Sequence, residues 1–207
     1  TMLNIKFADG RQVSVEAGTT VYDAAAAAEV ISREVLAATV NGELVGLTTP
    51  LTADSDVTLH TFEDKEGKKV FRHTASHILA QAVKRLYPEV KLTIGPAVDD
   101  GFYYDFDSDL PFDAAMLTAI EAEMKKIVKE NLRLERFTLP RDEAKKLMEE
   151  KDEPYKVLLI DRVPEGEDIS FYKQGDFVDL CAGPHLFSTG AVKAFKLIQC
   201  TGAYWEG

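Results

Sequence analysis

The chain has 207 residues, and its 24 basic and 35 acidic side chains give a net charge of −11. Hydrophobic residues make up 45% of the sequence, which is enough for packed cores and excludes a wholly disordered protein. No apolar run approaches the ~20 residues that cross a bilayer, and we expect no signal peptide before the opening strand. Because two cysteines are too few for a disulfide-rich secreted scaffold, we expect a cytoplasmic protein without a membrane partner.

The first 62 residues have the pattern of a small β-grasp, ubiquitin-like domain. Alternating apolar residues, turn dipeptides and an alanine-rich run indicate the order ββαββ. The expected elements are strands over Leu3–Phe7 and Gln12–Glu16, a helix over Val21–Val30 capped by Thr19 or Thr20, a hairpin over Thr39–Val45 and a strand over Asp56–Phe62. With 3 basic and 8 acidic residues, this region carries a charge of −5 and offers no evident face for nucleic acid.

Residues 63–207 are predicted to form a larger α+β domain with a mixed or antiparallel sheet. The charged stretch Glu63–Lys69 is either a linker or the lead-in to a helix. The expected elements are helices over Val70–Leu86, Phe112–Leu132, Arg141–Lys151 and Pro154–Val163, a strand pair within Lys91–Phe106, and strands over Leu132–Leu139, Phe171–Leu180 and Ala194–Gln199.

Two histidines, His73 and His77, are four residues apart within the first predicted helix of this larger domain. That spacing places both imidazoles on one helix face, where they can share a site. The structural alternative is a pair of polar side chains on the surface or at the edge of a core. No glutamate follows His73, so the zinc-protease pattern His-Glu-x-x-His is absent.

A second motif, Cys181-Ala-Gly-Pro-His185, combines a thiol with an imidazole. Its glycine and proline exclude a regular helix, so we expect a shaped loop after a strand. Together with His73 and His77, these side chains make a possible tetrahedral zinc set of three histidines and one cysteine. The chain has one further histidine, His60, which we place in a β-grasp strand. Neither a phosphate-binding loop of the Gly-x-x-x-x-Gly-Lys-Ser/Thr type nor a Gly-x-Ser-x-Gly elbow is present.

In this order, the motifs resemble the N-terminal part of bacterial threonyl-tRNA synthetases, in which a β-grasp (TGS) domain precedes an editing domain. The likeness covers essentially all 207 residues, and its markers are Val40–Leu44, His73–His77, Ile94–Asp105, Tyr155–Val157, Asp179–His185 and Gly202–Gly207. The two His- and Cys-containing motifs are also similar to the editing domain of alanyl-tRNA synthetases. The β-grasp region and the stretch Asp100–Phe106 favour the threonyl family.

The resemblance implies a TGS domain over residues 1–62 and an editing domain over 63–207 that hydrolyses seryl-tRNA for threonine. It implies catalytic roles for His73 and Lys156. It also implies a substrate-binding site lined by His77, Tyr104, Asp179, Cys181 and His185. The family's aminoacylation core and anticodon-binding domain would lie beyond Gly207, so we expect this chain neither to activate threonine nor to read an anticodon.

The partner implied by the resemblance is the 3′ end of threonine tRNA carrying serine. We expect this chain to be a monomer, and the full-length enzymes of the family to be homodimers. No cofactor is expected; the alternative is zinc held by His73, His77, Cys181 and His185, as in alanyl-type deacylases. A third possibility is a tRNA-binding module without catalysis. Because the chain is acidic, we expect it to bind tRNA weakly and with a strong salt dependence.

Overall fold

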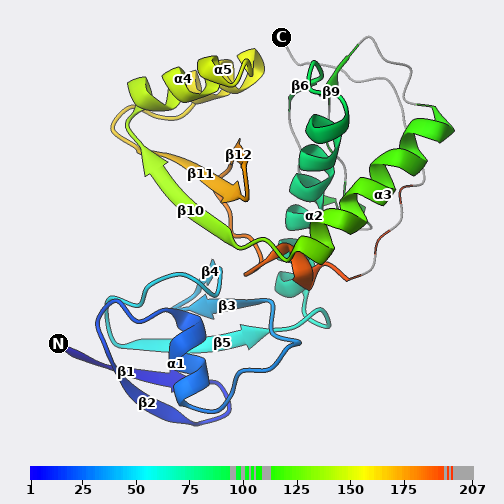
Figure 1. Cartoon of the computed structure of the whole chain (residues 1–207). Helices are drawn as coiled ribbons and strands as arrows, with labels where there is room; N and C mark the ends of the chain where they lie inside the picture. Colours follow the sequence, from blue (N-terminus) through cyan, green and yellow to red (C-terminus); the bar gives the residue numbers. More distant parts are fainter. Residues whose placement is uncertain are drawn as a thin grey trace. The chain divides into compact units, whose positions relative to one another are not determined.

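The computed structural model describes residues 1–93, 97–98, 101–102, 104, 106–108, 113–193, 195 and 197. Contacts within the chain divide it into two compact units, one formed by residues 1–71 with 183–187 and the other by 72–182 with 188–207. Each unit mixes helices with strands (Figure 1), which confirms the predicted α+β class. In the described ranges, no helix combines the length and the hydropathy that a bilayer crossing requires.

The first unit is a five-stranded sheet with one helix, and it has the strand order β2-β1-β5-β3-β4. Its elements are β1 (Met2–Phe7), β2 (Gln12–Glu16), α1 (Val21–Ala27), β3 (Ala37–Val40), β4 (Glu43–Val45) and β5 (Ser55–His60). β1 pairs antiparallel with β2 and parallel with β5 at the centre of the sheet. Alternate residues of β1, such as Ile5, are buried in the core beside α1, as the period-2 pattern predicts. The β-grasp prediction is therefore confirmed.

Local sequence signals explain where the elements of this unit start and turn. Thr20 caps α1, because its hydroxyl accepts a hydrogen bond of 3.1 Å from the amide of Asp23. The β3–β4 hairpin turns at Asn41 and Gly42, which both have positive φ angles of 48° and 86°. Two successive positive φ angles are the requirement of the tight hairpin turn for which Asn-Gly is favoured.

The second unit is built from helices and short sheets. Its elements, with the helix α2 that begins in the first unit, are α2 (Lys65–Leu86), β6 (Lys91–Leu92), β7 (Ala97–Val98), β8 (Gly101–Phe102), β9 (Phe106–Asp107), α3 (Ala114–Glu130), β10 (Leu134–Leu139), α4 (Arg141–Glu150), α5 (Pro154–Asp161), β11 (Ile169–Gln174), β12 (Phe177–Leu180) and the 3₁₀ turn Thr189–Ala191. Among the described residues, β6 pairs antiparallel with β9 and β7 with β8, which agrees with the predicted strand pair within Lys91–Phe106.

Helix α2 begins five residues before the predicted start, so the charged stretch is a helix lead-in rather than a linker. The carbonyl of Asp64 accepts a hydrogen bond of 3.0 Å from the amide of Lys68, which closes the first turn. Gly67 is the glycine that suggested a break. A Cβ atom at this position would lie 1.9 Å from the carbonyl oxygen of Thr61, so glycine permits close packing of the helix against the chain that precedes it.

The strand predicted over Phe171–Leu180 is instead a hairpin of two strands. The chain reverses at Gly175, which has a φ angle of 62°, and Gln174 pairs with Phe177 across the turn. The order β10-β11-β12 is antiparallel throughout, and α4 and α5 pack against it through a core that contains Met148, Ile160 and Phe171. The reversal depends on the positive φ angle of Gly175, which hydrophobic patterning does not show.

Some predicted features lie outside the described residues. These are the strand Ala194–Gln199, apart from single positions, parts of the marker Ile94–Asp105, and the marker Gly202–Gly207.

Candidate functional site

Helix α2 presents two imidazoles on one face, one turn apart. The rings of His73 and His77 lie edge to face, with their centroids 4.9 Å apart. The segment between them, Thr-Ala-Ser, contains no glycine or proline, so the helix continues through the motif. His73 is half-buried and His77 is buried with 3% exposure. The predicted shared face is therefore present, with one accessible and one enclosed ring.

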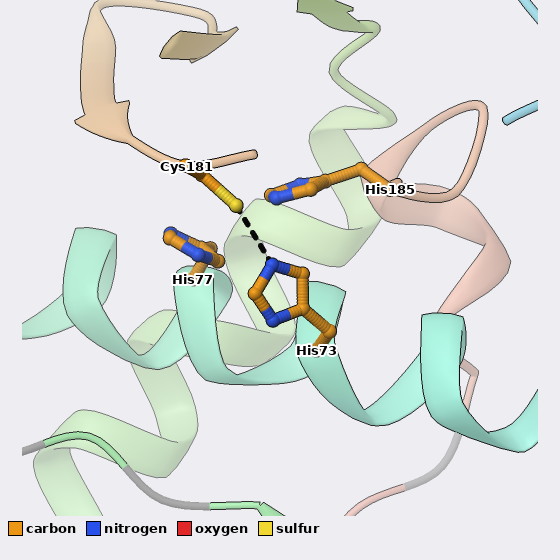
Figure 2. A group of neighbouring side chains, drawn as sticks. All are labelled: His73, His77, Cys181 and His185. Atoms are coloured by element: carbon orange, nitrogen blue, oxygen red, sulfur yellow. Dashed lines mark hydrogen bonds between the residues drawn. The ribbon is translucent and has the colours of Figure 1, made fainter. Parts of the chain in front are cut away.

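Cys181 follows the end of β12 and faces His73. Its Sγ lies 2.8 Å from Nε2 of His73 (Figure 2). Ser170 on the neighbouring strand holds the backbone of Cys181 on both sides. The Cys181 amide donates to the Ser170 carbonyl at 3.0 Å, and the Ser170 hydroxyl donates to the Cys181 carbonyl at 2.8 Å. The thiol is half-buried, so His73 and Cys181 form the accessible part of the site.

Behind them lies a buried cluster centred on Asp179, the third residue of β12. Its Oδ2 lies 2.9 Å from Nδ1 of His77 and accepts a hydrogen bond of 2.6 Å from the hydroxyl of Tyr104. Its other oxygen, Oδ1, lies 3.1 Å from the ammonium of Lys156. Asp179 is 1% exposed. One carboxylate therefore contacts an imidazole, a phenol and an ammonium that come from distant parts of the sequence.

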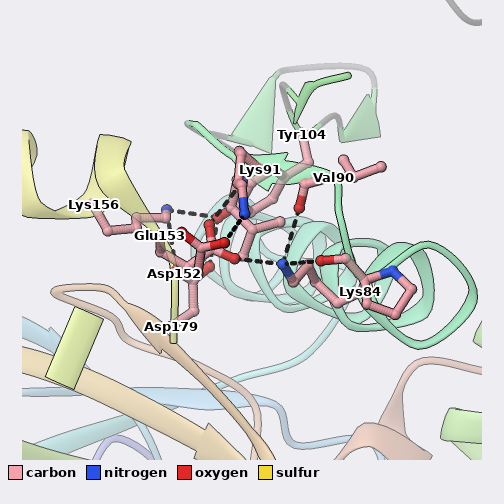
Figure 3. A network of polar contacts seen from close by, with 10 residues as sticks. Lys84, Val90, Lys91, Tyr104, Asp152, Glu153, Lys156 and Asp179 are labelled. Carbon is pink, nitrogen blue, oxygen red and sulfur yellow. Dashed lines mark hydrogen bonds and ion pairs between the residues drawn. The ribbon is translucent and has the colours of Figure 1, made fainter. Parts of the chain in front are cut away.

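Lys156 reaches this cluster from the first turn of α5. Its ammonium donates a hydrogen bond of 2.6 Å to the hydroxyl of Tyr104, besides its contact with Asp179. Lys156 is only 3% exposed. Figure 3 shows the side chain directed toward Tyr104 and Asp179. A buried ammonium needs such partners, because an unpaired charge in the interior is strongly unfavourable.

The charge states of the cluster follow from these contacts. Burial alone lowers the pKa of His77, but the Asp179 carboxylate and the Cys181 side chain outweigh it and raise this pKa to about 9. Burial alone raises the pKa of Asp179, but Lys156 and His77 hold it well below its usual range. Burial and the neighbouring Asp179 raise the pKa of Tyr104 well above its ordinary value. At neutral pH the cluster thus contains an imidazolium, a carboxylate and a neutral phenol.

Beside this cluster, four side chains have the ligand atoms of a metal site. One ligand atom each from His73, His77, Cys181 and His185 lies within 4.8 Å of the others (Figure 2). His185 is four residues after Cys181 in the segment 183–187, as the motif predicts. Two or three imidazoles with a thiolate suit zinc, and a carboxylate behind a ligating histidine is a frequent support of zinc sites. These residues therefore fit a zinc ion by chemistry.

The sequence predicted the members of this site but not their connections. All seven proposed residues have described positions, and the resemblance alone suggested Lys156 and Asp179. Their assigned roles stay predictions. Sequence reasoning missed Glu153, a buried acid that contacts Lys84 and the backbone of Leu92. Its position just before Pro154, the first residue of α5, was the available signal.

Comparisons with known proteins identify two domain families in this chain. Residues 3–61 match the TGS domain family, and residues 169–203 match the family described as "Threonyl and Alanyl tRNA synthetase second additional domain". Over all 207 residues the chain is 58% identical to threonine--tRNA ligases of Clostridium tetani and Acetivibrio thermocellus. Over 204 residues it is 57% identical to that of Caldanaerobacter subterraneus. The chain spans about a third of each relative, 32%, 33% and 32% of their lengths respectively.

Proposed function

Because the chain combines a TGS domain with a tRNA-synthetase editing domain and corresponds to the N-terminal region of bacterial threonine--tRNA ligases, we propose that it hydrolyses mischarged seryl-tRNA for threonine. The observation that supports a hydrolytic site is the pairing of the accessible His73 and Cys181 with the buried His77 and Asp179. The proposed partner is the 3′ end of threonine tRNA, and the proposed location is the cytoplasm. We propose that this chain acts as a monomer.

The need for such an activity follows from the size of the substrates. Serine lacks one methyl group of threonine, and that group is worth roughly 0.8 kcal/mol of burial. The amino-acid pocket of an aminoacylation site therefore prefers threonine over the smaller serine by only about 10- to 200-fold. A second site reverses the selection if it admits serine and excludes threonine by steric clash. Hydrolysis of the seryl ester then removes the error.

The proposed chemistry uses the accessible and the buried residues differently. A water molecule attacks the ester carbonyl, the bond to the ribose oxygen breaks, and that oxygen takes up a proton. His73 is positioned at the accessible side to accept a proton from the water or to polarise the ribose hydroxyl. His77 is an imidazolium whose Nδ1 is held by Asp179, so its Nε2–H can donate to the oxyanion that develops on the carbonyl.

Lys156 supports this arrangement electrostatically in the proposed mechanism. Its ammonium faces Asp179 and Tyr104, so its charge keeps Asp179 ionised, and Asp179 in turn keeps His77 protonated. The resemblance implies that Lys156 is a cationic group near the ester or the water, and the proposed role keeps its positive charge but places it at Asp179 and Tyr104. Direct contact of Lys156 with the ester stays a prediction.

Zinc-dependent hydrolysis is the second candidate, and the four converging ligand atoms favour it. A zinc ion at His73, His77, Cys181 and His185 would supply a bound water of lowered pKa. We propose the metal-free form, because four protein ligands would close a tetrahedral zinc site and leave no open position for that water. The ammonium of Lys156, which pairs with Asp179, also places a positive charge close to this set.

The test is single-turnover deacylation of threonine tRNA carrying either serine or threonine, at enzyme concentrations that saturate binding. We expect release of serine and retention of threonine. His73→Ala, which changes an accessible side chain, should abolish release of serine while the chain stays folded. Equal rates for the two esters would contradict the reversed selection. Tight tRNA binding without release of either amino acid would support the non-catalytic binding module instead.

A further inference from the structure

We propose that Glu153 is a positioning residue of the editing site, which anchors Lys156 to the helix that carries the two histidines. This inference rests on the proposed function for its consequence in catalysis, but its geometric basis is independent of it. Glu153 contacts neither His73 nor His77 in the described contacts. It acts through the first turn of α5 and through the far end of α2.

Glu153 is only 4% exposed, and both of its carboxylate oxygens contact other residues. Oε2 accepts a hydrogen bond of 2.9 Å from the backbone amide of Leu92, the last residue of β6. Oε1 forms an ion pair of 2.7 Å with the ammonium of Lys84. Any other position of this carboxylate would break one of the two contacts and leave a buried charge or donor unsatisfied. The carboxylate therefore has one strongly preferred position.

The backbone of Glu153 converts that anchor into a position for Lys156. The carbonyl of Glu153 accepts hydrogen bonds from the amides of Lys156 at 3.1 Å and Val157 at 3.3 Å. Pro154, the first residue of α5, restricts the backbone between them. The first helical turn is therefore tied to the carboxylate, and Lys156 extends from that turn to Tyr104 and Asp179.

Lys84 completes the connection at the other end. Its ammonium also donates hydrogen bonds of 2.9 Å to the carbonyls of Pro88 and Val90, so it is fixed by three acceptors (Figure 3). Lys84 follows His77 by seven residues, which is two turns along the same face of α2. A continuous series of contacts thus starts at His77 on α2 and returns to α2 at Lys84. It passes through Asp179, Lys156 and Glu153.

A neighbouring acid provides a matched control. Asp152 is adjacent to Glu153 in sequence and also pairs with a lysine, Lys91. Unlike Glu153, it is exposed, and its φ angle of 55° is one that asparagine tolerates well. Replacement by asparagine therefore removes one carboxylate from the same segment and leaves the contacts of the Glu153 carboxylate with Leu92 and Lys84 in place.

The experiment compares Glu153→Gln, Lys84→Met, their double variant and Asp152→Asn in the chain described here. Single-turnover release of serine gives the rate and the half-saturating enzyme concentration. We expect Glu153→Gln to slow the rate by about 10- to 100-fold with binding unchanged within about twofold, because a displaced catalytic group costs rate rather than affinity. The double variant should be no slower than the slower single variant, because both remove one interaction. Asp152→Asn should match the wild type.

A second readout does not depend on catalysis. Brief treatment with acetic anhydride, followed by mass spectrometry, reports the accessibility of Lys156, which should rise about tenfold in Glu153→Gln and Lys84→Met while circular dichroism stays unchanged. If Glu153→Gln does not fold, Lys84→Met carries the same test, because Lys84 is partly exposed. The proposal would be overturned if the two rate reductions multiplied in the double variant. It would also be overturned if the acetylation of Lys156 were unchanged in both single variants. If the wild-type chain releases no serine, the proposed function fails, and the acetylation result still decides whether Glu153 positions Lys156.

Discussion

Oδ2 of Asp179 lies 2.9 Å from Nδ1 of His77, and both side chains are almost fully buried. This contact fixes the orientation of the imidazole, because it assigns Nδ1 to the carboxylate, while Cys181 is the other hydrogen-bond partner of the ring. It also explains why a buried histidine is charged at neutral pH. The properties of the site therefore depend strongly on one aspartate.

Asp179→Asn is expected to destabilise the chain by about 3–5 kcal/mol, because it leaves the ammonium of Lys156 buried without its counter-charge. Urea unfolding at pH 7 measures this change. Asp176→Asn is the control, since Asp176 lies in the turn of the same hairpin and is exposed. Its effect should stay within about 0.5 kcal/mol. Similar unfolding midpoints for the two variants would contradict the buried cluster.

The stability of the chain should depend on pH through His77. The folded-state pKa of about 9 lies above the ordinary value of 6.5, so the pair contributes fully below pH 6.5 and its contribution is lost as pH rises through 9. We expect the free energy of unfolding to fall by about 3 kcal/mol between pH 6.5 and pH 10 from this group. Urea unfolding at several pH values, compared with His77→Gln, measures it. An identical pH dependence in both proteins would show that His77 is not the responsible group.

Tyr104→Phe removes a hydroxyl that donates to Asp179 and accepts from Lys156. The expected loss is about 1–3 kcal/mol of stability, because two buried charged groups each lose a partner. Tyr155→Phe is the matched control, since its hydroxyl donates to Asp107 at a less buried position. In thermal unfolding, the midpoint temperature of Tyr104→Phe should be lower than that of Tyr155→Phe. The reverse order would mean that the phenol contributes little to the cluster.

His73→Ala and Lys156→Met should separate catalysis from stability. The resemblance predicts that His73→Ala and Lys156→Ala lose deacylation while stability changes little. The structure alters that expectation for Lys156, which is buried and ion-paired, so Lys156→Met should cost about 3 kcal/mol. His73 is half-buried, and its replacement should cost less than about 1 kcal/mol. Chemical unfolding combined with serine release distinguishes the two effects. A Lys156→Met chain as stable as His73→Ala would contradict the importance of the buried pair.

The metal-free form predicts that a chelator leaves the deacylation rate unchanged. Elemental analysis before and after treatment, with the rate measured on the same samples, is the check. Removal of one tightly bound zinc per chain, with activity lost and then restored on addition of zinc, would establish the zinc-dependent form at His73, His77, Cys181 and His185. Addition of magnesium serves as the control for nonspecific effects of divalent ions.

Most of the fold could be predicted from local signals, because hairpin dipeptides, helix periodicity and caps act over a few residues. The turn at Asn41-Gly42 and the cap at Thr20 are examples. Two elements differ from the prediction. Helix α2 starts before the predicted Val70, where Gly67 permits a close approach to Thr61, and a hairpin replaces the predicted strand Phe171–Leu180, where Gly175 has a positive φ angle. Neither the close approach nor the backbone angle is visible in hydrophobic periodicity.

The site was harder to predict than the fold. The spacing of His73 and His77 indicates a shared helix face, but nothing in the sequence indicates that Asp179 contacts both His77 and Lys156. Such pairings depend on tertiary packing between residues far apart in the chain. Glu153 illustrates the same limit, because a charged residue before a helix normally reads as a solvated cap rather than as a buried anchor.

The sequence separations in the cluster have a consequence for assembly. His73 and Cys181 are 108 residues apart, Tyr104 and Asp179 are 75 apart, and Tyr104 and Lys156 are 52 apart. Long-range contacts of this kind form late and slowly, because loop closure is costly before other contacts compensate for it. A nascent chain that has not yet emerged past Asp179 therefore cannot hold His77 in its charged form. The site is complete only when the segments that build it have come together, so a partly folded chain should lack the proposed hydrolytic activity.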